Sequence, residues 1–133
     1  MRSGMNFPKE LKYTKSHEWA RRSGGKITVG ITDYAQKEIS DVVFVELPKT
    51  GQAAEQGKPV AVVESVKAAF DIYAPVSGKV VRVNAVLESD PGRVNADCYG
   101  QGWFFELEAS NEAEWNSLMS AEDYETHLQQ AAH

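Results

Sequence analysis

Residues 60–76 read VAVVESVKAAFDIYAPV, and this stretch has the pattern of a β-hairpin. Two short apolar runs, residues 60–63 and 70–73, are rich in the β-branched and aromatic side chains that favour strands. The residues between them include no Gly, Pro or Asn, but a type I turn tolerates such a sequence. We therefore expect a tight hairpin with Lys67 near its tip, where a flexible stem holds a primary amine clear of the sheet. On spacing alone, one more solvated lysine remains the simpler interpretation.

Short strands separated by turns dominate the rest of the chain. Outside this hairpin we expect strands at residues 11–19, 26–31, 42–47, 79–84 and 103–107. Gly24 and Gly25, after Ser23, predict a hairpin turn between the first two of these strands, and Pro48 ends the third. Further turns are expected at residues 75–78, 90–92 and 100–102.

Helices are expected mainly in the tail. Asp33 can cap one short helix at residues 34–39. In the tail, Asn111 and Ser120 each precede an acidic residue at capping-box spacing, which predicts helices at about residues 111–119 and 121–130. The residue pattern alone therefore indicates a compact β barrel or sandwich with helices at its edge.

Length and charge narrow the function classes. The chain has 133 residues, which favours one domain, and a formal net charge of −5, which disfavours nucleic-acid binding. It contains no apolar run of the roughly 18–20 residues that a membrane helix needs. Its single cysteine, Cys98, cannot form an intramolecular disulfide. Met5 is a candidate for the natural start, and the segment before it lacks a signal or transit pattern, so the cytoplasm is the expected compartment.

Catalytic and metal sites find little support. Ser65 lacks the G-x-S-x-G context of an activated nucleophile, and Cys98 lies among turn residues without an obvious base. His17, His127 and His133 do not follow a zinc-binding spacing, so no metal site is predicted.

Several motifs, taken together, resemble the H proteins of the glycine cleavage system. The main matches are YTKSHEW at 13–19, VGITDYA at 29–35, DVVFVELP at 41–48 and VESVKA at 63–68. Supporting matches are YAPVSG at 73–78, VN at 94–95 and YGQGW at 99–103. The resemblance extends over residues 11–128, in order and without large gaps.

This resemblance implies a mainly β barrel-sandwich hybrid of the lipoyl- and biotinyl-carrier type, with short peripheral helices and a helical C-terminus. Residues 1–10 would be an N-terminal extension, 11–110 the lipoyl-type β domain, and 111–133 a helical segment packed on the same domain. Lys67 matches the lysine that carries lipoate in amide linkage, with Glu64 and Ala68 as flanking recognition elements for the lipoate-attaching enzyme.

The family function implied is that of a carrier without catalytic activity of its own. Its lipoyl arm takes an aminomethyl group from glycine decarboxylase (P protein) to aminomethyltransferase (T protein). Dihydrolipoamide dehydrogenase (L protein) then reoxidises the dithiol. A cleft containing a carboxylate would shelter the cationic cargo from water, and the resemblance nominates Ser16 and Glu18 for it. Asp71, on the return strand of the hairpin, is a further candidate, although a solvated strand end explains all three equally well.

This chain departs from the family pattern at two places, and several competing hypotheses stay open. Cys98 stands where the family commonly has proline, and Ala69-Phe70 replaces smaller or more polar residues. A biotinyl domain typically has Met-Lys-Met, whereas this chain has Val66-Lys67-Ala68. The chain could also be a lipoyl domain of another complex, a Schiff-base enzyme or an unmodified interaction module. Nothing in the pattern demands more than a monomer, and a eukaryotic source would move the expected compartment to the mitochondrial matrix.

Overall fold

The computed structural model describes residues 5–131, so the expected extension at residues 1–10 and the end of the tail lie partly outside the described residues. The strands are β1 (Lys12–Tyr13), β2 (Glu18–Ser23), β3 (Lys26–Ile31), β4 (Val42–Glu46), β5 (Ala53–Ala54), β6 (Pro59–Ser65), β7 (Ala69–Tyr73), β8 (Gly78–Val83) and β9 (Phe105–Ala109). The helices are α1 (Asp33–Ile39), α2 (Val86–Ser89), α3 (Arg93–Ala96), α4 (Glu112–Asn116) and α5 (Ala121–Ala131). The predicted mainly β class with a helical C-terminus is confirmed.

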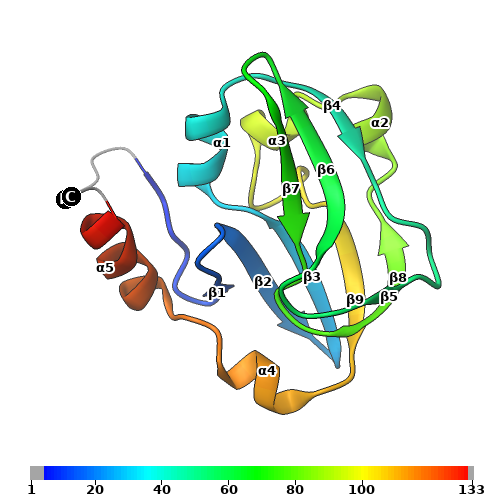
Figure 1. Ribbon diagram of the computed structural model, residues 1–133, viewed down its shortest axis with the longest axis vertical. Helices are drawn as coiled ribbons and strands as arrows, with labels where there is room; N and C mark the ends of the chain where they lie inside the picture. The colour runs from blue at the N-terminus through cyan, green and yellow to red at the C-terminus, as the bar shows by residue number, and fades with distance from the viewer. Residues whose placement is uncertain (1–4, 132–133) are drawn as a thin grey trace.

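The strands form two antiparallel sheets. One has the order β1-β2-β3-β9-β8-β5, and the other has the order β4-β6-β7 (Figure 1). The predicted turn between β2 and β3 is confirmed, since Gly24 and Gly25 both have positive φ, at 58° and 81°. Glycine adopts that conformation without the steric penalty that a Cβ would bring, and it matches the twist of the hairpin.

Alternating side chains of both sheets fill the core between them. Its fully buried members include Ile27, Val29, Val63 and Val80, with Phe104 and Phe105 from the chain around β9. The three-stranded sheet directs Val45 and Val63 inward and leaves Phe44 and Glu64, paired across β4 and β6, exposed. The β6–β7 hairpin therefore rests on the core through one face, and its turn projects beyond the sheet.

A second apolar cluster joins the two ends of the described chain. It consists of Phe7, Leu11, Tyr13, Trp19, Ala121, Tyr124 and Leu128. Within it Tyr13 stacks on Tyr124 with ring centroids 4.9 Å apart, and Phe7 meets Tyr124 edge to face at 5.4 Å. Helix α5 lies beside the N-terminal segment in Figure 1, held through this cluster and, just before the helix, through an antiparallel bridge between Met119 and Tyr13.

Several sequence expectations differ from the structure. The strand expected at residues 11–19 is two strands, because the chain turns back at residues 14–17, where His17 has φ 77°. Helix α1 is capped by Thr32 and not by Asp33, because the Thr32 hydroxyl accepts the N–H of Ala35. Helices α2 and α3 were not predicted at all, and α4 ends earlier than expected.

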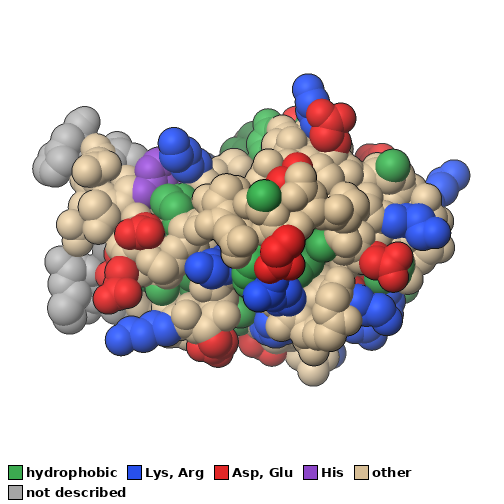
Figure 2. Space-filling model, turned by 90° about the horizontal axis from the view of Figure 1, so that it is seen from below, with side chains coloured by type: hydrophobic (Ala, Val, Ile, Leu, Met, Phe, Trp, Pro, Cys, Tyr) green, Lys and Arg blue, Asp and Glu red, His purple; other side chains and the backbone are tan. Residues whose placement is uncertain are grey.

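The described helices include none that is both long and apolar enough to cross a membrane. On the face shown in Figure 2, acidic and basic side chains are interspersed.

Candidate functional site

The turn between β6 and β7 presents Lys67. Strand pairing ends with Glu64 opposite Ala69, which leaves Lys67 near the middle of the connection. The Ser65 hydroxyl accepts the N–H of Lys67 at 3.1 Å, and the Ser65 N–H donates to the carbonyl of Ala68 at 2.9 Å. A side chain thus replaces the Gly or Asn that a tight turn often needs, because a serine hydroxyl can satisfy nearby backbone groups.

The Lys67 side chain is exposed and reaches toward α1. Its Nζ donates to the backbone carbonyl of Glu38, at a distance of 2.8 Å. The neighbouring Val66 N–H donates to the carbonyl of Asp41 at 3.0 Å, so the turn is held against the end of α1 from two points. Glu64 and Ala68, the expected recognition residues, are both exposed beside it.

A cavity of about 390 Å³, here called the α1 cavity, lies next to this lysine. It is lined by Ser16, His17, Ile31, Tyr34, Ala35, Glu38, Ile39, Val63, Phe70, Asp71, Ile72 and Tyr73. One wall comes from the turn before β2, a second from α1, and a third from β7. Two of the expected cleft residues, Ser16 and Asp71, are therefore brought together at a cavity that also includes Glu38, the residue whose carbonyl accepts the Lys67 amine.

Glu18, the third expected cleft residue, lies beneath the surface instead. Only 1% of it is exposed, and it does not line the α1 cavity. Its Oε1 accepts the hydroxyls of Thr14 and Ser16, each at 2.6 Å, and its Oε2 accepts the N–H of Tyr73 at 3.2 Å. Burial raises the pKa of the Glu18 carboxyl, and these hydrogen bonds oppose that rise. The carboxylate acts here as an internal anchor for the turn that carries Ser16.

His17 and Tyr34 also line the α1 cavity, although the sequence did not single them out for it. Their rings lie 4.9 Å apart between centroids. Burial lowers the pKa of His17, and His127 lowers it further, which favours the neutral imidazole. His17 lies within the same matched motif as Ser16 and Glu18, so that motif could have drawn attention to it.

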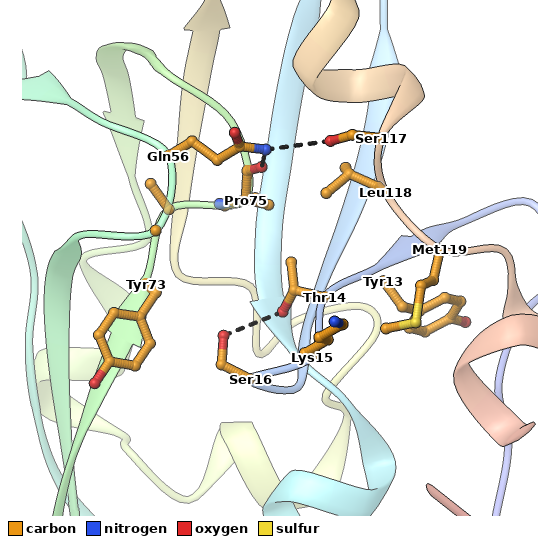
Figure 3. A pocket seen from close by; sticks show the side chains of 12 residues that line it. Tyr13, Thr14, Lys15, Ser16, Gln56, Tyr73, Pro75, Ser117, Leu118 and Met119 are labelled. Carbon is orange, nitrogen blue, oxygen red and sulfur yellow. Dashed lines mark hydrogen bonds between the residues drawn. The ribbon is translucent and has the colours of Figure 1, made fainter. Parts of the chain in front are cut away.

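A second cavity, of about 280 Å³, lies on the other side of the turn at residues 14–17 (Figure 3). We call it the Gln56 cavity, because the Gln56 side-chain amide donates to the carbonyl of Pro75 at 3.0 Å and to the Ser117 hydroxyl at 3.4 Å. Ser16 and Tyr73 line both cavities. The turn at residues 14–17 therefore separates the two spaces.

The Cys98 thiol and the potential metal-ligating side chains of the described residues do not indicate a second functional site. Burial raises the pKa of the Cys98 thiol to about 12, and nearby Asp33 contributes to the rise, so the thiol stays protonated near neutral pH. Within residues 5–131 there is no group of three or more His, Cys, Asp or Glu side chains arranged to hold a metal ion.

Known proteins similar to this chain share one description. The family model described as "Glycine cleavage H-protein" matches residues 11–131. A glycine cleavage system H protein of Psychrobacter cryohalolentis is 53% identical over 124 residues, covering 92% of this chain and 98% of that protein. The one of Thermus thermophilus is 52% identical over 128 residues, covering 96% of this chain and all of that protein.

A solved structure agrees with the sequence comparison. The crystal structure of a glycine cleavage system H protein from Mycobacterium marinum superposes with a TM-score of 0.82 at 34% identity, covering 92% of this chain and 99% of that one. The expected barrel-sandwich fold is thereby confirmed. Because the family model and these relatives span nearly the whole chain, the chain belongs to the glycine cleavage H-protein family.

Proposed function

We propose that Lys67 is the residue through which this lipoyl carrier of the glycine cleavage system holds its lipoyl group. The observation that carries the proposal is the exposed amine of Lys67 in the β6–β7 turn, beside the α1 cavity. Attachment through an amide removes the lysine charge but leaves one N–H on Nζ, which can still donate to the Glu38 carbonyl. The turn therefore fits a modified lysine without rearrangement of its neighbours.

When attached, the lipoyl group supplies a disulfide that is reduced as it takes up the aminomethyl group of glycine and is later reoxidised. The chain's own part is to hold, orient and shelter this arm. A covalent tether keeps the cargo at high effective concentration near each partner. No catalytic residue is assigned to the chain itself.

The proposed partners are the other components of the system. They are glycine decarboxylase, aminomethyltransferase, dihydrolipoamide dehydrogenase and a lipoate-attaching enzyme. The exposed flanks of Lys67, Glu64 and Ala68, are proposed as recognition points for the attaching enzyme. The relatives from Psychrobacter and Thermus are bacterial, which supports the expected cytoplasmic compartment.

The α1 cavity is proposed as the cleft that shelters the loaded arm. Ser16 offers a hydroxyl on one wall, and Asp71 offers a carboxylate that can pair with a cationic amine. Glu18 is assigned a different role from the one expected, because it is buried and acts by holding the Ser16 hydroxyl. The apolar walls from Ile39, Val63 and Ile72 limit the access of water.

The direct test is the intact mass of the protein before and after incubation with a lipoate–protein ligase, ATP and lipoate. We expect one lipoyl increment, mapped to the peptide that contains Lys67 and lost in Lys67→Arg. Lys58→Arg is the matched control, since Lys58 is an exposed lysine at the other end of the same hairpin. An increment that persists in Lys67→Arg, or no increment on the folded protein, would refute the assignment.

A further inference from the structure

A buried hydrogen-bond chain connects the C-terminal helix with two walls of the α1 cavity. Tyr124, on α5, is fully buried. Its hydroxyl lies 2.8 Å from Nδ1 of His17 and 2.8 Å from Oγ1 of Thr32. A single phenol from the far end of the chain thus contacts His17, which lines the cavity, and Thr32, which caps the helix that forms another of its walls.

The first contact supports the turn at residues 14–17. His17 has φ 77°, a left-handed conformation that a histidine adopts rarely and that surrounding contacts must hold. The backbone holds it only in part, through the His17 N–H to the Thr14 carbonyl at 3.2 Å and the Thr32 N–H to the His17 carbonyl at 3.0 Å. The hydrogen bond between the imidazole Nδ1 and the Tyr124 hydroxyl fixes the side chain that lines the cavity.

The second contact supports the start of α1. Thr32, fully buried, is the N-cap of this helix, and its hydroxyl accepts the N–H of Ala35 at 3.1 Å. Ala35 and Tyr34 of α1 line the cavity opposite the turn, and Glu38, further along the helix, accepts the Lys67 amine. The position of the Thr32 hydroxyl therefore helps to fix the first turn of α1, which forms this wall of the cavity.

The Tyr124 ring is itself fixed. It is stacked on Tyr13 at 4.9 Å and meets Phe7 edge to face, so its hydroxyl cannot move far unless α5 moves. The phenol joins the two walls through short contacts, and α5 carries it without lining the cavity.

We propose that Tyr124 is a positioning residue, which fixes the turn at residues 14–17 and the start of α1 relative to each other. The C-terminal helix thereby helps to shape the cavity that shelters the arm. The sheltering rests on the proposed function of the α1 cavity, whereas the coupling of the two walls stands on the contacts alone. Tyr124 does not line the α1 cavity, so it acts on the cavity through His17 and Thr32.

The test compares Tyr124→Phe with Tyr13→Phe. Each variant removes one buried hydroxyl from the same aromatic cluster, but the Tyr13 hydroxyl donates to the carbonyl of Pro8, away from the cavity. Amide hydrogen exchange on the unmodified protein is followed at His17 and Ala35. We expect exchange at both sites to be about tenfold faster in Tyr124→Phe, because His17 and the Thr32 cap that is bonded to Ala35 each lose one hydrogen bond to the Tyr124 hydroxyl, and unchanged in Tyr13→Phe.

The second readout uses the lipoylated protein carrying the aminomethyl group. Tyr124→Phe should lose this group several-fold faster than wild type, with lipoylation of Lys67 unchanged. Thr32→Val should also show faster amide exchange and faster loss of the aminomethyl group. Thr32→Ser, which keeps the hydroxyl, should behave like wild type. Equal exchange in the two tyrosine variants, or faster exchange without faster loss of the cargo, would overturn the proposal. Failure of wild type to take up lipoate at Lys67 would instead refute the proposed function, and the exchange data would still decide whether Tyr124 couples the walls.

Discussion

The β6–β7 turn lies beside the α1 cavity and the turn at residues 14–17 lines it, but the two turns are built in opposite ways. The β6–β7 turn is exposed and presents Lys67 to solvent, and it is held by one serine hydroxyl and by hydrogen bonds to backbone carbonyls. The turn at residues 14–17 is held by hydrogen bonds to the buried carboxylate of Glu18 and contains His17, which has positive φ. The proposed role of the first turn requires access for partner enzymes, and its exposure fits that role. The second has to keep its shape, so it is fixed by polar groups that are costly to disturb.

The largest expected effect comes from removing the buried anchor. Glu18→Ala would leave the hydroxyls of Thr14 and Ser16 and the N–H of Tyr73 without their acceptor. We expect a loss of about 3 kcal/mol in the free energy of unfolding, since a hydrogen bond to a charged group contributes about 1.5–3 kcal/mol, while hydration of the partly exposed donors and removal of the desolvated carboxylate offset part of the summed cost. Urea unfolding measures the change. Loss of the aminomethyl group should also accelerate, while lipoylation proceeds, and a stability change below about 0.5 kcal/mol would show that Glu18 is no anchor.

The corresponding change in the other turn should cost less. Ser65→Ala removes the acceptor for the N–H of Lys67, and we expect a loss of about 1 kcal/mol, typical of a side chain that caps backbone groups. Because the lysine would then sample more conformations, lipoylation by the ligase should slow. Urea unfolding and the time course of the mass increment measure the two effects. Equal destabilisation by Ser65→Ala and Glu18→Ala would contradict the contrast between the turns.

The pH dependence of the free energy of unfolding tests the turn at residues 14–17 through His17. Burial lowers the pKa of His17 below its ordinary 6.5, so the unfolded chain binds a proton there more readily than the folded chain. Stability from this group is therefore present above pH 6.5 and is lost as the pH falls from 6.5 toward the lowered pKa. His17→Asn removes this dependence and keeps a residue that tolerates positive φ.

Urea unfolding at pH 7.5 and 5.5 checks this expectation. The difference in the free energy of unfolding between wild type and His17→Asn should shrink at the lower pH. The contribution of the raised pKa of Glu18 cancels in this difference, because both proteins contain that residue. An advantage that stays constant between the two pH values would mean that the fold does not disfavour the protonated His17.

The smallest effect on stability is expected at Asp71. This residue is exposed on β7, so Asp71→Ala should change the free energy of unfolding by less than about 0.5 kcal/mol. Loss of the aminomethyl group should nevertheless accelerate, because the α1 cavity loses an acidic side chain. The decay of the loaded protein measures this. If Asp71→Ala and Glu18→Ala both decay like wild type, neither carboxylate protects the cargo.

The sequence predicted the lysine turn well because its determinants are local. Two apolar runs and a short connection suffice to place Lys67 near the end of a hairpin. The burial of Glu18 was not predicted, since a glutamate in a short motif looks solvent-exposed and one of its hydrogen bonds comes from the distant Tyr73 N–H. Tyr124 could not be connected with His17 from the sequence, because 107 positions separate them.

The short helices were missed for a similar reason. Helices α2 and α3 each have four residues and lack a side-chain N-cap, so neither periodicity nor capping marks them. The residues at 90–92, predicted as a turn, do connect these two helices. By contrast, α5 was predicted nearly to its ends, because the Ser120 hydroxyl accepts the N–H of Asp123 as the capping-box pattern indicates.

The central claim is that the arm on Lys67 lies in the α1 cavity. Amide chemical shifts of the ¹⁵N-labelled protein, compared before lipoylation and after loading with the aminomethyl group, test it most directly. We predict shifts at Ala35, Ile39 and Ile72, which line only the α1 cavity, and none at Gly57 and Leu118, which line only the Gln56 cavity. Shifts confined to residues 64–69, or shifts at Gly57 and Leu118, would contradict the claim.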